Sequence, residues 1–137
     1  MEIKTNQVCE DLIALTWCVK STMFQLAEAH GLTPPQLFAL HTILRGGNTM
    51  GRVADTMHCD ASNMTGVIDR LVTQKLVVRA ESKSDRRTRN LTLTDKGRQL
   101  IQEIVDSLPE RLGCSKLNSN ERQALHATLE VLSKAVS

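Results

Sequence analysis

The residues best suited to chemistry in this sequence are the polar side chains of segment 61–74. If the segment is helical, its polar and apolar residues fall on opposite sides. The predicted contact residues are Ser62, Asn63, Met64, Thr65, Asp69, Arg70 and Thr73. Small side chains near a helix start permit close approach to another surface. Asparagine can read adenine, and arginine can bind guanine or a phosphate, so these residue types suit a base-reading face.

A second set of polar residues lies a few positions further along. Between Leu76 and Arg98 there are seven basic and three acidic residues, whereas the net charge of the whole chain is only +2. Such a local excess can attract phosphate groups. The predicted contacts here are Lys83, Ser84, Asp85, Arg86, Arg87 and Arg89. Arginine is favoured by the negative potential of a minor groove. We expect the two carboxylates, Asp69 and Asp85, to orient neighbouring arginines.

Hydrophobic periodicity predicts the elements that position these residues. Apolar residues three or four apart indicate helices, and alternation indicates strands. The predicted helices cover 8–30, 34–45, 50–57, 61–74, 95–112 and 119–135, and the predicted strands cover 76–80 and 88–93. Thr33, Thr49, Asp60 and Thr94 stand where helix N-caps are expected. A helix, a tight turn, a second helix and a hairpin form a winged helix-turn-helix, here from Thr49 to Leu93.

The fold class predicted is therefore mainly α with a small β-hairpin wing. A chain of 137 residues is expected to form one domain. Within it, residues 32–98 form the winged helix-turn-helix lobe. Residues 1–31 and 99–137 form long terminal helices with apolar stripes.

Several motifs together resemble the MarR family of bacterial regulators, and the resemblance covers essentially the whole chain. The matching segments are Leu32–Gln36, Asp60–Leu71, Lys75–Arg79, Asp85–Arg87 and Leu91–Gly97. The combination of Asp-Arg-Leu, Asp-Arg-Arg and Leu-Thr-Asp-Lys-Gly is more specific than any one piece. One departure is local: family members often have glycine where this chain has Lys75-Leu76.

This resemblance implies a homodimer that binds a palindromic operator in double-stranded DNA, commonly as a repressor, with the terminal helices forming the dimer interface. A two-fold dimer would place two half-sites about one DNA turn apart. The resemblance also implies a small-molecule effector pocket between the dimer helices and the DNA-binding lobe. The candidate pocket residues are Trp17, Met23, Phe24 and Phe38.

A thiol-based peroxide sensor is the main alternative. In the OhrR branch of the family a reactive cysteine lies in the first helix, and Cys9 occupies a similar position here. That branch surrounds its thiol with tyrosines, and this chain has none. Glu10 and Asp11 also oppose formation of a thiolate, which is the reactive form. An inert thiol is the simpler interpretation.

Other function classes fit the sequence less well. His58, Cys59 and Asp60 are adjacent on a short turn, where residues rarely chelate one ion together, and His30, His41 and His126 lack helical pair spacing, so we expect no metal and no cofactor. No enzyme motif is present. A winged helix used only for protein contacts has no need of Arg86 and Arg87.

The remaining expectations concern location. No stretch is long and apolar enough to cross a membrane, and no signal peptide is evident. The sequence therefore predicts a cytoplasmic protein with four reduced cysteines.

Overall fold

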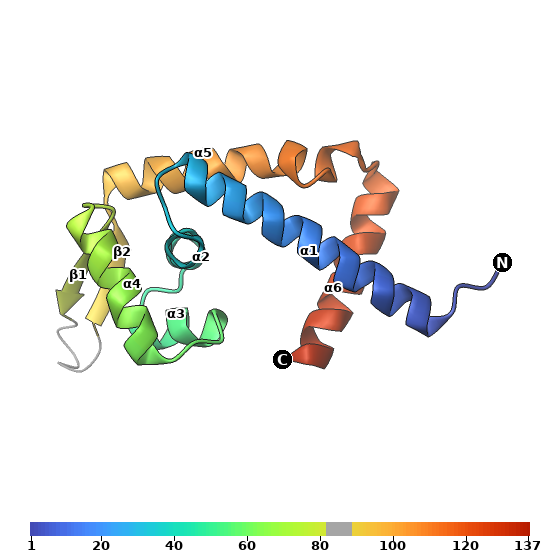
Figure 1. Ribbon diagram of the computed structural model, residues 1–137, viewed down its shortest axis with the longest axis horizontal. Helices are drawn as coiled ribbons and strands as arrows, with labels where there is room; N and C mark the ends of the chain where they lie inside the picture. The colour runs from blue at the N-terminus through green and yellow to red at the C-terminus, as the bar shows by residue number, and fades with distance from the viewer. Residues whose placement is uncertain (82–88) are drawn as a thin grey trace. The chain divides into compact units, whose positions relative to one another are not determined.

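The computed structural model describes residues 1–81 and 89–137 of the chain. The chain forms two compact units, Met1–Ile104 and Val105–Ser137. The first unit contains four helices, a hairpin and the start of a fifth helix (Figure 1). Their bounds are α1 Thr5–Ala29, α2 Pro34–Leu44, α3 Met50–Thr56, α4 Ala61–Thr73, β1 Val77–Glu81, β2 Arg89–Leu93 and α5 Asp95–Arg111. Each predicted element is present, with ends shifted by a few residues.

Local chemistry accounts for the ends of α2. Its start is a capping box, in which the Thr33 hydroxyl accepts from the Gln36 amide and the Gln36 side chain accepts from the Thr33 amide. Its C-terminus is closed by the Gly46 amide on the Ile43 carbonyl and the Gly47 amide on the Thr42 carbonyl. Gly46 has a φ of +99°, which glycine adopts without strain.

Helix α4 lies within one residue of its predicted bounds, but its N-terminal cap differs from the expectation. Asp60 stands at its N-cap position but makes no side-chain capping hydrogen bond, so that predicted role is wrong. At the other end, the amides of Lys75 and Leu76 bond to the carbonyls of Val72 and Leu71. This closure requires a left-handed residue, and Lys75 provides it with a φ of +62°. The departure from glycine at this turn therefore leaves the usual turn geometry intact.

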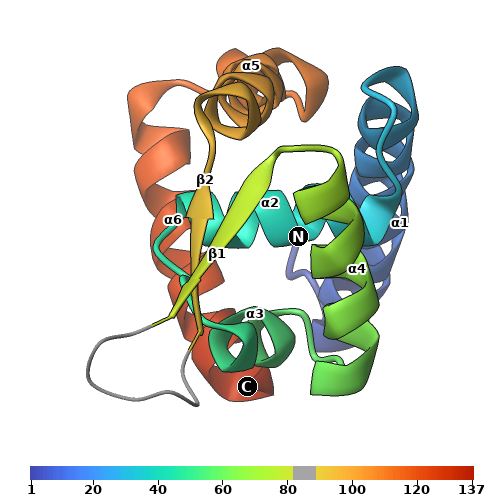
Figure 2. The same cartoon turned by 90° about the vertical axis from the view of Figure 1, so that its left-hand side faces the viewer.

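The core of the first unit surrounds α2, which packs against α1, α3, α4 and β2. Figure 2 shows the hairpin in front of α2, with α3 below α2 and α4 to the right of the hairpin. The largest fully buried side chains include Leu37, Leu40, Met64, Ile68 and Leu71. Burying one such side chain contributes about 1.5–3 kcal/mol. This core holds the outer face of α4 and the hairpin at fixed positions.

The hairpin is a two-stranded antiparallel sheet whose register pairs Val77 with Leu93 and Arg79 with Leu91. Alternation along the strands buries Val77, Leu91 and Leu93. At the base of the hairpin, Gly97 of α5 lies close to the backbone of Leu76, the residue before β1. The Thr94 hydroxyl donates to the Lys75 carbonyl and accepts from the Gly97 amide, so this predicted cap is confirmed.

The second unit contains the end of α5, a short 3₁₀ turn, Cys114–Lys116, and α6, Ser119–Val136. Gly113 follows the end of α5 with a φ of +77°. Asn118 and Glu121 form a capping box at the start of α6. No residue of α6 is buried. None of the helices in the described parts of the chain has the length and apolar character needed to span a bilayer.

Candidate nucleic-acid interface

Helix α4 presents two faces of opposite character. Met64, Ile68 and Leu71 are buried in the core. The polar residues at the intervening positions are exposed, and they are Ser62, Asn63, Thr65, Asp69, Arg70 and Thr73. Because the buried residues anchor the helix, the polar face has a fixed direction. The prediction of Met64 as a contact residue is wrong, since its side chain is only 1% exposed and faces the core.

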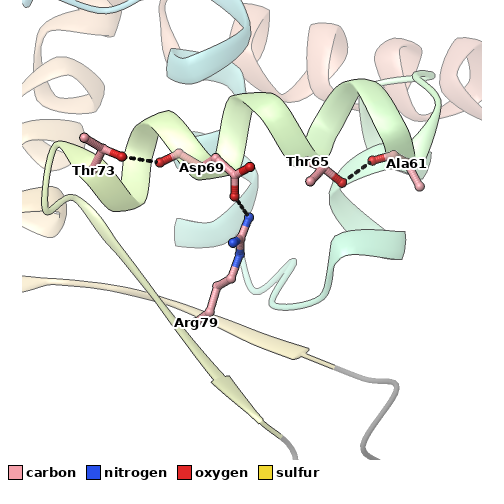
Figure 3. A network of polar contacts seen from close by, with 5 residues as sticks. All are labelled: Ala61, Thr65, Asp69, Thr73 and Arg79. Carbon is pink, nitrogen blue, oxygen red and sulfur yellow. Dashed lines mark hydrogen bonds and ion pairs between the residues drawn. The ribbon is translucent and has the colours of Figure 1, made fainter.

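Two of the polar residues are held by the helix itself. The hydroxyl of Thr65 donates to the Ala61 carbonyl at 3.0 Å, and that of Thr73 donates to the Asp69 carbonyl at 3.0 Å (Figure 3). Each hydroxyl oxygen keeps lone pairs that can accept a further bond. The two threonines therefore present ordered acceptors on the exposed face.

An ion pair joins this face to the hairpin. The guanidinium of Arg79 on β1 donates to the Asp69 carboxylate on α4, as Figure 3 shows. The Arg79 side chain is 25% exposed and that of Asp69 is 54% exposed. The expectation that Asp69 orients an arginine agrees with this contact. Its partner comes from the strand, ten residues away in sequence.

The basic tip lies almost entirely outside the described residues. Lys83, Ser84, Asp85, Arg86 and Arg87 belong to segment 82–88, so their predicted contacts remain predictions. Arg89 is the first residue of β2, opposite Glu81 in the register. The pairing of Glu81 with Arg89 stands at the end of the register opposite to the pairing of Val77 with Leu93.

An apolar cavity of about 570 Å³ lies behind α4, within the first unit. Three of the four predicted pocket residues line it: Met23 and Phe24 from α1, and Phe38 from α2. Trp17 lies instead on an adjoining hollow with Lys20 and Phe24. The Lys20 ammonium is 5.0 Å from the centre of the Trp17 ring and 5.4 Å from that of Phe24, within the range of a cation–π contact.

The cavity is also lined by residues that the sequence pattern did not predict as pocket residues. Asn63, Met64 and Val67 of α4 contribute to its wall, as do Met57 and Cys59 from the turn before α4. No periodicity links these positions to α1, because only the tertiary fold brings the two helices together. A molecule in the cavity would therefore touch the helix that carries the polar face.

The cysteines and histidines form no evident centre. All four cysteines are exposed and free. Among the described residues, no group of three or more histidine, cysteine or acidic side chains is arranged to hold a metal ion. Burial, followed by the charge of Arg45, lowers the pKa of His41.

Comparison with known proteins places this arrangement in a family. A sequence model described as "MarR family" matches residues 30–88. The transcriptional repressor MdtR of Bacillus subtilis strain 168 is 33% identical over 95 residues, which are 69% of this chain and 61% of that protein's length. The organic hydroperoxide resistance transcriptional regulator of the same strain is 27% identical over 132 residues, covering 93% of this chain and 90% of that protein.

A solved structure extends the comparison to the whole fold. The transcriptional repressor CouR, bound to a 23-mer DNA duplex, is 25% identical, with a TM-score of 0.74 and complete coverage of both chains. The opposite polar and buried faces of α4, and the hairpin that follows this helix, are consistent with these similarities. The chain belongs to the MarR family of winged helix-turn-helix transcriptional regulators.

Proposed function

We propose that this protein is a homodimeric transcriptional repressor that binds a palindromic site in duplex DNA and is released by a small-molecule effector. The observation that carries the proposal is the exposed polar face of α4, anchored from behind by Met64, Ile68 and Leu71. In a helix-turn-helix, the second helix enters the major groove while the first braces it. Here α4 is the reading helix and α3 the bracing helix.

The hairpin would act as a wing beside the reading helix. The pair between Arg79 and Asp69 connects the two elements. Arg86 and Arg87, at the tip, are the side chains proposed to enter the flanking minor groove, where arginine is electrostatically favoured. The solved structure of CouR, a repressor similar to this chain, has a DNA duplex bound, which supports the same use of the fold here.

The dimer is proposed from the apolar surfaces that each unit leaves exposed. On α1, Val8, Leu12 and Leu15 are 50%, 40% and 57% exposed. On α6, Leu125 and Leu129 are 40% and 46% exposed. Residues four apart lie on one helix face, so these are stripes rather than scattered positions. Association of two chains would bury them, and would set the spacing of the two reading helices in the cytoplasm.

Two measurements test the proposal. Selection of bound sequences from random duplex DNA should enrich a palindrome whose half-sites lie about one helical turn apart. Asn63→Ala should then reduce discrimination at one base pair of each half-site by about 1–3 kcal/mol. Asn120→Ala, an exposed asparagine on α6, is the matched control and should bind like the wild type. Absence of any enriched sequence would contradict the proposal.

The dimer has its own test. Sedimentation at micromolar concentration should give twice the chain mass. Leu125→Asp with Leu129→Asp should give the mass of a monomer and should weaken operator binding, because one reading helix then has to hold the site alone. A wild-type protein that sediments as a monomer would contradict the homodimer.

A further inference from the structure

A polar hollow of about 470 Å³ lies between the end of α2 and α3. Its side chains include His41, Thr42 and Arg45 at the end of α2, and Arg52, Asp55 and Thr56 on α3. It shares no lining residue with the apolar cavity behind α4, so the two are separate features. We call it the α2–α3 hollow. Sites for organic ligands have largely apolar walls, whereas these polar walls suit a charged group.

The charge of the α2–α3 hollow comes from two guanidiniums, those of Arg45 and Arg52, and one carboxylate, that of Asp55. Among the described residues, no ion pair or side-chain hydrogen bond joins either guanidinium to another group. Burial and the charge of Arg45 lower the pKa of His41, so that side chain is neutral near pH 7. Positive charge therefore exceeds negative charge in the hollow.

Arg52 stands where a helix disfavours a positive charge. It lies in the first turn of α3, and the amides at a helix N-terminus carry a partial positive charge. Arg45 follows the C-terminus of α2, where the partial charge is negative and a guanidinium is favoured. The stability of α3 therefore gives no reason for an arginine at position 52, whereas binding of an anion does.

Short contacts fix the walls of the hollow. The Gly47 amide donates to the Thr42 carbonyl at 2.9 Å, and a Cβ on Gly47 would lie 2.7 Å from the methyl carbon of Thr42. The start of α3 is tied to the hairpin, because Thr49 forms an antiparallel bridge with Asn90 of β2. The hollow is therefore held in a set position relative to the wing.

Helix α3 lies beside both elements that are proposed to contact DNA. It packs against α4 and against β2. Figure 2 shows it between the lower end of the hairpin and the beginning of α4. A duplex that meets α4 and the wing must therefore pass close to α3, and the first helix of a helix-turn-helix crosses the DNA backbone. Guanidiniums bind phosphate oxygens through parallel hydrogen bonds, so the chemistry of the hollow matches this backbone.

We infer that the α2–α3 hollow is a phosphate clamp, in which Arg45 and Arg52 bind a phosphodiester group of the DNA backbone. The Thr56 hydroxyl can serve as a third donor. This inference rests on the proposed DNA-binding function and adds to it a contact outside α4 and the wing. Phosphate contacts fix the register of a protein on the duplex but read no bases. The clamp therefore sets where α4 meets the base pairs, and not which bases α4 prefers.

Binding of the selected operator and of an unrelated duplex, each at several salt concentrations, tests the clamp. Arg45→Gln with Arg52→Gln should weaken binding of both duplexes by the same factor, about tenfold or more. The logarithmic salt slope should fall by about one, for one phosphate. Arg45→Lys with Arg52→Lys should keep the slope, because the charge remains, but should bind more weakly than the wild type. Arg98→Gln, exposed on α5, is the matched control and should bind like the wild type.

Two further measurements exclude a simple folding defect. Asp55→Asn removes the carboxylate from the hollow and should tighten binding of both duplexes, a gain that loss of folding cannot produce. Operators with a single uncharged methylphosphonate linkage then locate the phosphate. At one or more positions this linkage should weaken binding of the wild type and have no effect on binding of the Arg45→Gln, Arg52→Gln variant.

The outcomes separate this inference from the proposed function. A loss confined to the operator, an unchanged salt slope, or a double variant that responds to every methylphosphonate as the wild type does would each overturn the clamp. So would binding of inorganic phosphate to the DNA-free protein, measured by calorimetry, that the double variant loses while it keeps full duplex affinity. The hollow would then hold a free anion. Absence of duplex binding by the wild type would instead contradict the repressor function itself.

Discussion

Arg79 on the first strand of the hairpin is paired with Asp69 on the exposed face of α4. The contact joins the wing to the reading helix outside the hydrophobic core. Since Asp69 is about half exposed, solvent screens the pair, and such pairs contribute about 0.2–1 kcal/mol to stability. Its greater value is geometric, because it fixes the direction of the hairpin relative to α4.

Asp69→Ala and Arg79→Ala should each lower the free energy of unfolding by no more than about 1 kcal/mol. Both should weaken operator binding, because the wing loses its tie to α4. Arg79→Ala should leave the salt dependence of binding unchanged, since its charge is already neutralised by Asp69. Urea unfolding and binding at several salt concentrations measure the two effects. A reduced salt slope in Arg79→Ala would instead make Arg79 a phosphate contact.

Arg86→Ala with Arg87→Ala should weaken operator binding and flatten its salt dependence. If each arginine neutralises one phosphate, the logarithmic slope should fall by about two. Fluorescence anisotropy with a labelled operator at matched salt concentrations gives this slope. Arg111→Ala, at the end of α5, serves as the comparison and should retain the wild-type slope. Unchanged binding in the double variant would remove the wing tip from the interface.

Gly97→Ala should destabilise the fold strongly. A Cβ at this position would lie 2.0 Å from the Leu76 carbonyl oxygen, which is backbone and accepts a hydrogen bond from the Thr94 amide. Relief requires α5 to move from the hairpin base, at a cost of about 1–3 kcal/mol or more. Gly51→Ala is the control: its Cβ meets open space within α3, so it should stabilise the helix by up to about 1 kcal/mol. Thermal unfolding of both variants distinguishes them.

His41 should make stability depend on pH. Burial and the charge of Arg45 lower its pKa below the ordinary 6.5, and Arg52 and Asp55 line the same hollow. The unfolded chain therefore takes up a proton first as the pH falls. The stabilising contribution is complete above the ordinary pKa and is lost as the pH drops through the lowered value.

His41→Gln should accordingly show a smaller loss of stability than the wild type between about pH 7.5 and about pH 5. Urea unfolding at each pH measures this. His126→Gln replaces an exposed histidine on α6 and should keep the wild-type decline. Identical declines in the wild type and in His41→Gln would show that His41 is not the group responsible.

Organic peroxide should leave operator binding unchanged in the wild type and in Cys9→Ser. Cys9 is exposed on α1, and the chain contains no tyrosine. The similarity to the hydroperoxide resistance regulator makes the experiment necessary. If peroxide released the wild-type protein from the operator but left Cys9→Ser bound to it, the result would favour the sensor alternative.

The sequence determined what depends on neighbours along the chain. The ends of the helices depend on residues only a few positions apart in the chain. The capping box of Thr33 and Gln36 starts α2, and Gly31 and Gly46, with φ of +69° and +99°, follow the ends of α1 and α2. The alternation of buried and exposed residues on α4 follows from helical geometry, so the exposure of all six of its polar candidate residues could be predicted from the helical period alone. Asp60 shows the limit, because a residue at the right position need not make the cap.

The tertiary structure alone decided what depends on chain segments meeting in space. The partner of Asp69 comes from β1, where strand register sets the position of Arg79. The helical period places Met64 on the apolar side of α4, and the packing of α2 against α4 buries it almost completely. The apolar cavity needs Phe24, Phe38 and Val67 from three separate helices, and no pattern in the chain predicts their proximity. Local bonding and helical period are written in short stretches of sequence, whereas packing between distant elements depends on the fold as a whole.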